Sequence, residues 1–295
     1  MLHLVVNPVA GRGRGSAALE RVVRSLERAG LALAVHHTER PRHATELVSN
    51  LPDGSVPVAV GGDGTIHEVA IACLRRGFTM GLLPMGSGDD FAFALSVDRF
   101  DVDAAVRALA SGHSRAVDVG WVNGEPFVNS FGSGFDADVA RRIEHAPRVY
   151  RGLGRYLFGI VTAMRDFTVR EAQVWVDGEE VHAGPALLVG TQNGPRAGGS
   201  FLFSPRARTD DGLLDVVVAG RFGRAGTMAI LPKVMRGTHE RHPRIHTFSG
   251  REVRVLWSSA VVAHVDGEGL GDQTNEFSVC LEPGGLRVLA RPEPG

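Results

Sequence analysis

The sequence predicts a two-domain protein, with an N-terminal α/β domain built on a mostly parallel sheet and a C-terminal β-rich sandwich domain. Its 295 residues correspond to about two domains. Apolar strand-like runs alternate with helix-like segments up to about residue 117, which favours a parallel sheet covered by helices. Farther along, Asn-Gly and Asp-Gly pairs separate apolar runs, and such pairs are typical of β-hairpins.

In the first domain, residues 1–117, strands and helices are expected to alternate. Short runs rich in apolar residues predict strands over Leu2–Val6, Leu31–His36, Val56–Val60 and Met80–Leu83. The apolar spacing from Leu19 to Leu26 predicts a helix over Ser16–Ala29, which stops at Gly30. Further helices are expected over His43–Ser49, Thr65–Arg76 and Asp101–Ala110.

The second domain, residues 118–285, is expected to contain hairpins around Asn123-Gly124 and Asp177-Gly178. Further strands are expected over Leu213–Ala219, Glu252–Leu256, Val261–Val265 and Phe277–Leu281. One helical insertion, Asp136–Arg165, and a helix near Gly226–Arg236 interrupt them. Residues 286–295 form a tail that we expect to return to the first domain, and a cleft is expected between the domains.

Composition excludes several classes of function. The 32 basic and 33 acidic residues give a net charge of −1, which argues against nucleic-acid binding through bulk charge. Lys233 is the only lysine, so a lysine-centred Walker A loop is absent. Two cysteines, Cys73 and Cys280, fit a reducing cytosol, and no signal peptide is evident. Because Leu157–Met164 reaches only about half a bilayer span, we expect a cytoplasmic protein that contacts a membrane peripherally at most.

Three polar, glycine-containing loops follow three of the expected strands: Asn7–Ser16, Gly61–Glu68 and Leu83–Ala92. The carboxyl ends of parallel strands meet at one edge of a sheet, where ligands bind. Glycine-rich turns that precede helices suit phosphate. Each loop alone also fits a tight turn with a capped helix, in which Thr65 is a candidate cap. Three such loops at one edge favour the phosphate interpretation.

The second loop, Gly61–Glu68, closely matches the GGDGT-x-[NH]-E motif of the diacylglycerol kinase catalytic-domain family, which includes bacterial lipid kinases and the sphingosine and ceramide kinases. Other segments resemble motifs of this family in the same order: Asn7–Gly11, Pro84–Ala92, Phe131–Ala137, Asp211–Val216 and Asp266–Glu268. The resemblance covers nearly the whole chain. Ala10 and Asp89 depart from it, because the family usually has Ser and Asn there.

The resemblance implies a fold like that of NAD kinase and diacylglycerol kinase, and a site for ATP and magnesium. Asp63 and Asp90 are the nearest carboxylates for the magnesium network, since this ion prefers carboxylates, phosphate oxygens and water. The resemblance places these residues around ATP: Asn7, Gly11, Thr38, Gly62, Asp63, Gly64, Thr65, Glu68, Ser87 and Asp90.

Two further sites are expected in the second domain. In an extended segment Asp266 and Glu268 would face the same side, although their spacing alone favours an Asp-Gly hairpin turn. The resemblance offers this pair as the base that accepts the substrate's proton, with Asp63 as the rival. It also implies a second metal held by Asp211 and the carbonyls of Arg208 and Leu213, where a plain β-turn is the alternative.

The interpretation is an ATP- and magnesium-dependent lipid kinase that phosphorylates a hydroxyl of a diacylglycerol-like or sphingoid-like lipid. An NAD kinase-like enzyme and a lipid- or nucleotide-binding regulator without catalysis are the alternatives.

The basic segment Arg141–Arg155, with Tyr150, Leu157 and Phe158 nearby, either touches anionic headgroups or is a plain basic helix face. His239, His242 and His246 are interpreted as part of a solvated loop rather than a zinc site. A homodimer is left open.

Overall fold

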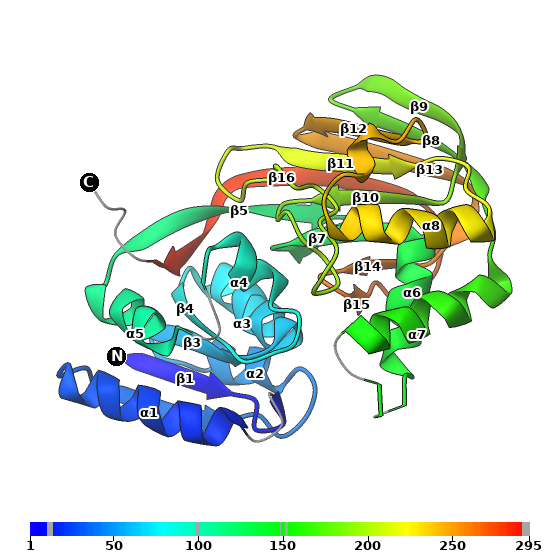
Figure 1. Ribbon diagram of the computed structural model, residues 1–295. Coiled ribbons are helices and arrows are strands. Elements are labelled where there is room, and N and C mark those ends of the chain that lie inside the picture. The colour runs from blue at the N-terminus through cyan, green and yellow to red at the C-terminus, as the bar shows by residue number, and fades with distance from the viewer. Residues whose placement is uncertain (11–13, 98–100, 148, 151–152, 291–295) are drawn as a thin grey trace. The chain divides into compact units, whose positions relative to one another are not determined.

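The computed structural model describes residues 1–10, 14–97, 101–147, 149–150 and 153–290 (Figure 1). The chain forms two compact units: Met1–Asp118 together with the chain from Gly284 onward, and Val119–Pro283. Two strands, β5 (Ser114–Val122) and β16 (Thr274–Leu289), carry the chain from one unit to the other.

The sheet of the first unit is parallel, as predicted. Its strands are β1 (Leu2–Val6), β2 (Leu33–His37), β3 (Val56–Gly61) and β4 (Thr79–Pro84), in the order β2-β1-β3-β4. On the free side of β4, Arg287 and Val288 of β16 pair in parallel with Thr79 and Met80. All five residues of β1 are buried, which is typical of a central strand covered on both faces.

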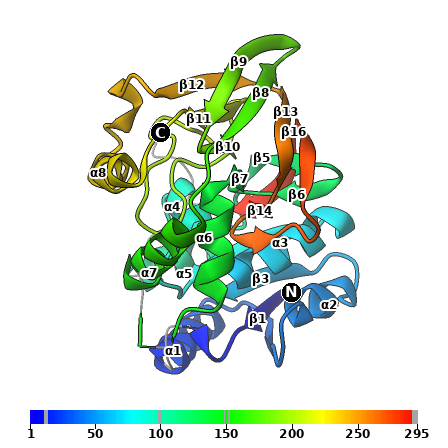
Figure 2. The ribbon, with the colours of Figure 1, turned by 90° about the vertical axis from the view of Figure 1, so that its right-hand side faces the viewer.

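Five helices in the described residues of this unit flank the sheet: α1 (Arg14–Arg28), α2 (His43–Ser49), α3 (Asp63–Arg76), α4 (Asp90–Ala94) and α5 (Val102–Ser111). Figure 2 shows α1 and α5 on one side of the strands and α2 and α3 on the other.

One sequence expectation about these helices needs correction. Helix α3 begins at Asp63 after Gly62, so Thr65 lies inside the first turn and does not cap it. Helix α4 was expected only as the alternative interpretation of the third loop, because five residues are too few to show a periodic pattern.

The second unit is a β-sandwich, again as predicted. One sheet has the order β12-β11-β10-β7-β14-β15, with antiparallel pairing throughout. Its strands are β7 (Ser130–Gly134), β10 (Leu188–Gln192), β11 (Leu214–Ala219), β12 (Ile245–Gly250), β14 (Ala263–Val265) and β15 (Glu268–Gly269). The other contains β8 (Arg170–Val176), β9 (Glu179–Ala186), β13 (Glu252–Val261) and β16, with the hairpin of β5 and β6 (Glu125–Phe127). Phe131 and Val216 of the first sheet pack with Val255 and Phe277 of the second.

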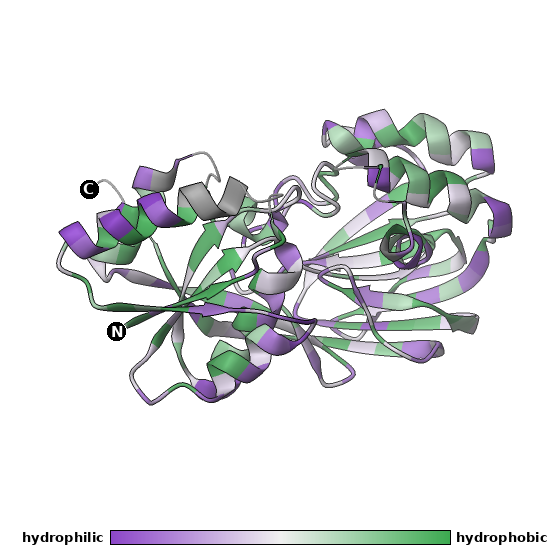
Figure 3. Ribbon diagram, turned by 90° about the horizontal axis from the view of Figure 1, so that it is seen from below, coloured by the Kyte–Doolittle hydropathy of each residue, from purple (hydrophilic) through white to green (hydrophobic). Residues whose placement is uncertain are grey.

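Helices α6 (Phe135–Glu144), α7 (Leu153–Ala163) and α8 (Arg224–Met235) carry both hydrophobic and hydrophilic positions (Figure 3). Their apolar side chains share a second core with the six-stranded sheet, in which Phe135, Ile160 and Ile230 pack with Val217. The single helical insertion expected over Asp136–Arg165 is therefore two helices, followed by a 3-10 turn over Met164–Asp166. None of the helices in the described part of the chain is long and apolar enough to cross a membrane.

Three hairpin turns share one backbone geometry. Asn123-Gly124 and Asp177-Gly178 both have positive φ at the two central positions, at 49° and 87° and at 49° and 84°. Asp266-Gly267 has the same signs, at 50° and 90°, and joins β14 to β15. Positive φ at both positions defines the type I′ turn, whose twist matches that of paired strands. The segment from Asp266 to Glu268 is thus a tight turn, which the Asp-Gly spacing by itself favours, and it is not an extended segment.

His239 lies in the 3-10 turn His239–Arg241 and is only 1% exposed, so the expectation that it belongs to a solvated loop is wrong. Its Nε2 lies 3.1 Å from the carbonyl oxygen of Phe203, to which it donates if the proton is on that nitrogen. Burial lowers the pKa of His239, and the hydrogen bond to Phe203 opposes that shift only in part. Burial likewise lowers the pKa of His182.

We predict that the second unit loses stability as the pH falls below about 6.5, the usual histidine pKa. Between that value and the lowered pKa of His239, the unfolded chain binds the proton and the folded chain does not, so acid favours unfolding. Urea unfolding followed by tryptophan fluorescence measures this unit, because Trp121, Trp175 and Trp257 all lie in it. The pH dependence should be shallower in His239→Gln, and an unchanged dependence would contradict the assignment to His239.

Candidate functional site

The carboxyl ends of β1, β2, β3 and β4 lie at one edge of the parallel sheet, and polar loops follow there. The strand order is β2-β1-β3-β4, so the chain runs from β1 to β2 in one direction across the sheet and from β3 to β4 in the opposite direction. The loops after β1 and β3 therefore diverge, and ligands of parallel sheets bind in the crevice between such loops. The side-chain amide of Asn7, after β1, donates to the hydroxyl oxygen of Thr65 at 3.2 Å. Thr38 joins this edge, since its N–H donates to the carbonyl of Val6 at 2.9 Å.

Asp63 fastens the loop after β4 to the loop after β3. Its Oδ2 accepts the N–H of Asp89 at 2.9 Å, and its Oδ1 accepts the N–H of Asp90 at 2.7 Å. Both oxygens therefore receive backbone donors from the start of α4. Asp90 is itself buried, and its backbone N–H lies against the Asp63 carboxylate at this point of the sheet edge.

The same two loops approach each other backbone to backbone at Gly62 and Gly86. A Cβ atom at Gly86 would lie 2.6 Å from the Cα of Gly62, and one at Gly62 would lie 3.1 Å from the Cα of Gly86. A side chain at Gly86 would therefore force the loops apart. Sequence reasoning gave Gly86 no role, although its place in the Pro84–Ala92 motif was a usable signal.

Asp89 has a positive φ of 54°, and its Oδ1 accepts the N–H of Gly86 at 2.9 Å. Asp and Asn both tolerate this backbone region, and an amide oxygen would accept the same hydrogen bond. The departure from the family's usual Asn therefore preserves the turn.

Glu68 accepts hydrogen bonds from the backbone at the start of α2. Its two carboxylate oxygens accept the N–H groups of Arg42 at 2.9 Å and Ala44 at 3.0 Å, at the start of α2. It therefore ties α2 to α3, and its expected contact with ATP stays a prediction. Gly64 lies in the first turn of α3, and Ser87 is exposed in the loop after β4. Gly11 lies outside the described residues.

In the second unit, Asp266 closes its hairpin turn onto the start of β7. Its Oδ1 accepts the N–H groups of Asn129 at 2.9 Å and Ser130 at 2.8 Å, and its Oδ2 accepts that of Val128 at 3.0 Å. Glu268 is exposed at the start of β15, and its carboxylate accepts no hydrogen bond from the described residues. The two carboxylates thus have different surroundings.

The loop expected to hold a second metal is a turn with Gly212 at a φ of 73°. Asp211 Oδ1 accepts the N–H of Leu213 at 3.1 Å, and Arg208 Nε lies 3.3 Å from the carboxylate of Asp210. Burial raises the pKa of the nearby Asp215 carboxyl; the charge of Asp211 adds to this shift, and a hydrogen bond from Ser249 opposes it. Within the described ranges, no group of three or more His, Cys, Asp or Glu side chains forms a ready metal site.

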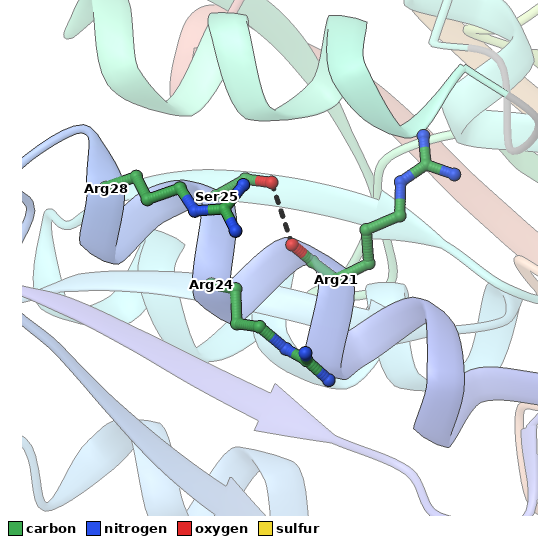
Figure 4. Close-up of a pocket in the computed structure, with 4 residues that line it drawn as sticks. All are labelled: Arg21, Arg24, Ser25 and Arg28. Atoms are coloured by element: carbon green, nitrogen blue, oxygen red, sulfur yellow. Dashed lines mark hydrogen bonds between the residues drawn. The ribbon is translucent and has the colours of Figure 1, made fainter.

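A small surface pocket lies on α1, away from these loops. It is lined by Arg21, Arg24, Ser25 and Arg28 (Figure 4). The hydroxyl of Ser25 donates to the carbonyl of Arg21 at 2.8 Å. Exposed ion pairs with Asp103 and Glu20 partly neutralise Arg21 and Arg24, so the pocket offers less positive charge than its residues suggest.

Two family models match the chain. The diacylglycerol kinase catalytic domain matches residues 1–122, and the YegS C-terminal NAD kinase beta sandwich-like domain matches residues 129–290. The chain is 27% identical to the "Diacylglycerol kinase" of Bacillus subtilis (strain 168), covering 93% of this chain and 92% of that protein. It is 34% identical to the "Probable lipid kinase YegS-like" of Pseudomonas aeruginosa (strain PAO1), covering 94% and 91%.

Solved structures show the same fold. A diacylglycerol kinase from Bacillus anthracis str. Sterne superposes with a TM-score of 0.75 at 23% identity, covering 99% of this chain and 97% of that one. An NAD kinase from Archaeoglobus fulgidus, solved in complex with ATP, superposes with a TM-score of 0.53 at 16% identity, covering 98% and 93%.

We predict that Gly86→Ala separates the two loops at the sheet edge. The added methyl group meets the backbone of Gly62, and overpacking of this kind costs about 1–3 kcal/mol. We expect a lower melting temperature and at least tenfold weaker binding of ATP, measured by calorimetry. Gly154→Ala is the matched control, because its Cβ would meet nothing within 4 Å. Wild-type ATP affinity in Gly86→Ala would show that the close approach is not needed for binding.

Proposed function

The chain belongs to the diacylglycerol kinase catalytic-domain family and is a lipid kinase, and from this premise we propose that it transfers the γ-phosphate of ATP to a hydroxyl of a diacylglycerol-like or sphingoid-like lipid. The observation that carries the proposal is the clamp at the sheet edge, where Asp63 holds the N–H groups of Asp89 and Asp90 while Gly62 packs on Gly86. This arrangement fixes the loop after β4 against the loop after β3, next to the N-terminus of α3.

Phosphoryl transfer requires that the γ-phosphate be positioned and its charge neutralised, and that an acceptor oxygen lie in line with it. In our proposal the loops after β1, β3 and β4 hold the phosphates through backbone N–H groups, and the amino end of α3 favours their negative charge. Magnesium, when bound, neutralises charge on the phosphate oxygens. Asp63 and Asp90 fit this ion because it needs only one or two carboxylates besides phosphate and water.

The proton of the acceptor hydroxyl must be taken up by a base, and we assign this role to the Asp266 and Glu268 pair, with Asp63 as the rival. The contacts suggest a division of labour within the pair. Asp266 receives three backbone N–H groups and so fixes the turn, whereas the Glu268 carboxylate is exposed and accepts no hydrogen bond from the described residues. We therefore assign the proton to Glu268, whose carboxylate has no structural hydrogen bond to make within the described residues.

The proposal is tested by transfer of labelled γ-phosphate from ATP with magnesium to a panel of acceptors in detergent micelles. The panel contains diacylglycerol, monoacylglycerol, sphingosine, ceramide, phosphatidylglycerol and NAD. We expect label in one lipid product, which would identify the substrate class. Label in NAD alone would favour the NAD kinase-like alternative. ATP binding without transfer to any acceptor would favour a regulator, and Asp89→Asn would then be tested for restored activity.

We predict that Glu268→Gln lowers kcat by about 10²–10⁴-fold, the usual contribution of a general base. The amide preserves shape but does not accept the proton. ATP affinity and the melting temperature should stay at wild-type values, because the Glu268 carboxylate accepts no hydrogen bond from the described residues. Asp266→Asn should lower both turnover and stability, since its amide would point a donor at backbone donors. Normal turnover in Glu268→Gln would move the role to Asp266 or Asp63.

We also propose a second, structural metal at Asp211 with the carbonyls of Arg208 and Leu213. The negative charge of Asp211 supports it: burial raises the pKa of Asp215, the charge of Asp211 adds to that shift, and a cation at this turn would offset the charge. We predict that purified wild-type protein contains more bound magnesium or calcium per chain than Asp211→Ala, measured by elemental analysis after dialysis. Equal metal content in the two proteins would refute the site.

A lipid substrate requires access to a membrane, and we propose that the surface around α7 makes a peripheral contact with it. Large apolar side chains are exposed there: Val149 at 77%, Tyr150 at 43%, Leu153 at 37%, Leu157 at 40% and Val161 at 56%. Leu153, Leu157 and Val161 are four residues apart, so they lie along one helix face. Arg141 and Arg155 are also exposed, and both are close to these apolar residues along the chain. Basic residues beside an apolar face favour binding to anionic lipid surfaces.

We predict that Leu157→Ser combined with Val161→Ser weakens sedimentation with phosphatidylglycerol vesicles by at least fivefold and leaves turnover of a lipid in detergent micelles unchanged. Met228→Ser is the matched control, because Met228 on α8 is as exposed as Leu157, at 40%. If Met228→Ser weakens vesicle binding equally, the α7 surface is not the contact. Equal binding to neutral and anionic vesicles would remove the electrostatic part of the proposal.

A further inference from the structure

A polar pair on the outer face of the six-stranded sheet lies next to the turn that carries Asp266. His264 belongs to β14, and Asp136 lies in the first turn of α6, directly after β7 ends. The Nε2 of His264 lies 3.4 Å from Oδ2 of Asp136, with the side chains only 10% and 16% exposed. The other ring nitrogen, Nδ1, lies 3.3 Å from the N–H of Gly267. His264 therefore links helix α6 to the hairpin turn.

These two contacts specify one form of the imidazole ring. The backbone N–H of Gly267 is a donor, so Nδ1 must carry a free lone pair. The ring proton then sits on Nε2, where it faces the carboxylate of Asp136. The second oxygen of Asp136, Oδ1, is buried and accepts no hydrogen bond from the described residues. Nε2 of His264 is thus the side-chain nitrogen that lies within ion-pair distance of this carboxylate.

The pair occupies space that exists because position 132 is glycine. Gly132 lies on β7 directly across from His264 on β14. A Cβ atom at Gly132 would overlap Oδ2 of Asp136 and would lie 2.6 Å from Nε2 of His264. Gly190 on β10 is the other cross-strand partner of Gly132. A Cβ atom there would meet its nearest neighbour, Nε2 of Gln192, at an ordinary 3.4 Å.

The hairpin turn is thereby held from two sides. Asp266 binds the N–H groups at the start of β7, and Gly267 is bound by His264, whose partner Asp136 follows the end of the same strand. These contacts, together with the chain from β7 into α6, connect β7, α6, β14 and the turn in a closed circuit. Such a circuit limits the turn to one position, and the turn leads directly into Glu268.

We propose that His264 and Asp136 are positioning residues that set the place of the Asp266-Gly267 turn, and with it the place of Glu268, for phosphoryl transfer. The inference rests on the proposed function, because it assigns the turn to the acceptor side of the reaction. Neither residue needs to touch the substrate. A displacement of about 1 Å of a reacting group can cost about 10²-fold in rate. The contacts of His264 and Asp136 should therefore affect kcat rather than ATP binding.

The first test compares Gly132→Ala with Gly190→Ala. The first substitution pushes Asp136 and His264 apart without removing a functional group, and the second adds the same methyl group one strand away. We expect Gly132→Ala to lower kcat about 10- to 100-fold with an unchanged KM for ATP, and Gly190→Ala to stay within about twofold of wild type. Equal losses in both variants, or no loss in Gly132→Ala, would overturn the proposal.

The second test separates the two contacts of His264. The amide of His264→Asn offers an acceptor near the Nδ1 position, whereas His264→Gln reaches towards Asp136 but loses that acceptor. We expect His264→Asn to retain most of kcat and His264→Gln to lose it. Asp136→Asn, which still accepts from Nε2, should retain more activity than Asp136→Leu. The reverse order in either pair would overturn the assignment.

A third readout does not depend on activity. Hydrogen exchange at the Gly267 amide, followed by NMR or mass spectrometry, should become faster in His264→Gln and Gly132→Ala but not in His264→Asn or Gly190→Ala. Unchanged exchange in all four variants would overturn the linkage between His264 and the turn. If wild-type protein phosphorylates no acceptor while the exchange rates respond as expected, the proposed function fails and the linkage within the fold stands.

Discussion

The structure depends on the parallel arrangement of β1 to β4, because that arrangement sends every loop of the first unit that carries a family motif to one edge of the sheet. Asn7, Thr38, Gly62 and the segment after Pro84 are far apart in the chain and meet only through strand order. Because the chain runs from β1 to β2 and from β3 to β4 in opposite directions across the sheet, the loops after β1 and β3 diverge at this edge, which is where ligands of parallel sheets bind. The Gly62 and Gly86 contact and the hydrogen bonds of Asp63 then hold the loop after β4 against the loop after β3.

Several acidic residues of the motifs act first on the backbone. Asp63, Glu68, Asp89 and Asp266 each accept backbone N–H groups from segments that would otherwise lack partners. An unpaired buried N–H is costly, so each carboxylate stabilises the shape of its loop. A motif residue can therefore support function through position alone. Glu268 differs, since no described residue donates to it, and this contrast is the basis for separating the role of Glu268 from that of Asp266.

Sequence patterns identified the elements with strong local signals and missed those without them. The His43–Ser49 helix and the Leu2–Val6 strand have the predicted bounds, because each is a compact apolar pattern between clear breaks. Strand β7 was missed, since Ser-Phe-Gly-Ser-Gly shows no apolar alternation. Its glycine at position 132 is instead required by the side chains of His264 and Asp136, which come from other elements. A pattern within one segment does not show such a requirement.

The sequence by itself determined the fold class, the hairpins at Asn123-Gly124 and Asp177-Gly178, and the membership in a lipid kinase family, because turn chemistry and contiguous motifs are local properties. Only the tertiary structure decided what the side chains contact. It assigned Glu68 to the backbone of α2, Asp266 to the start of β7 and His264 to the turn after β14. These hydrogen bonds join residues brought together by strand pairing and packing, and no spacing along the chain specifies them.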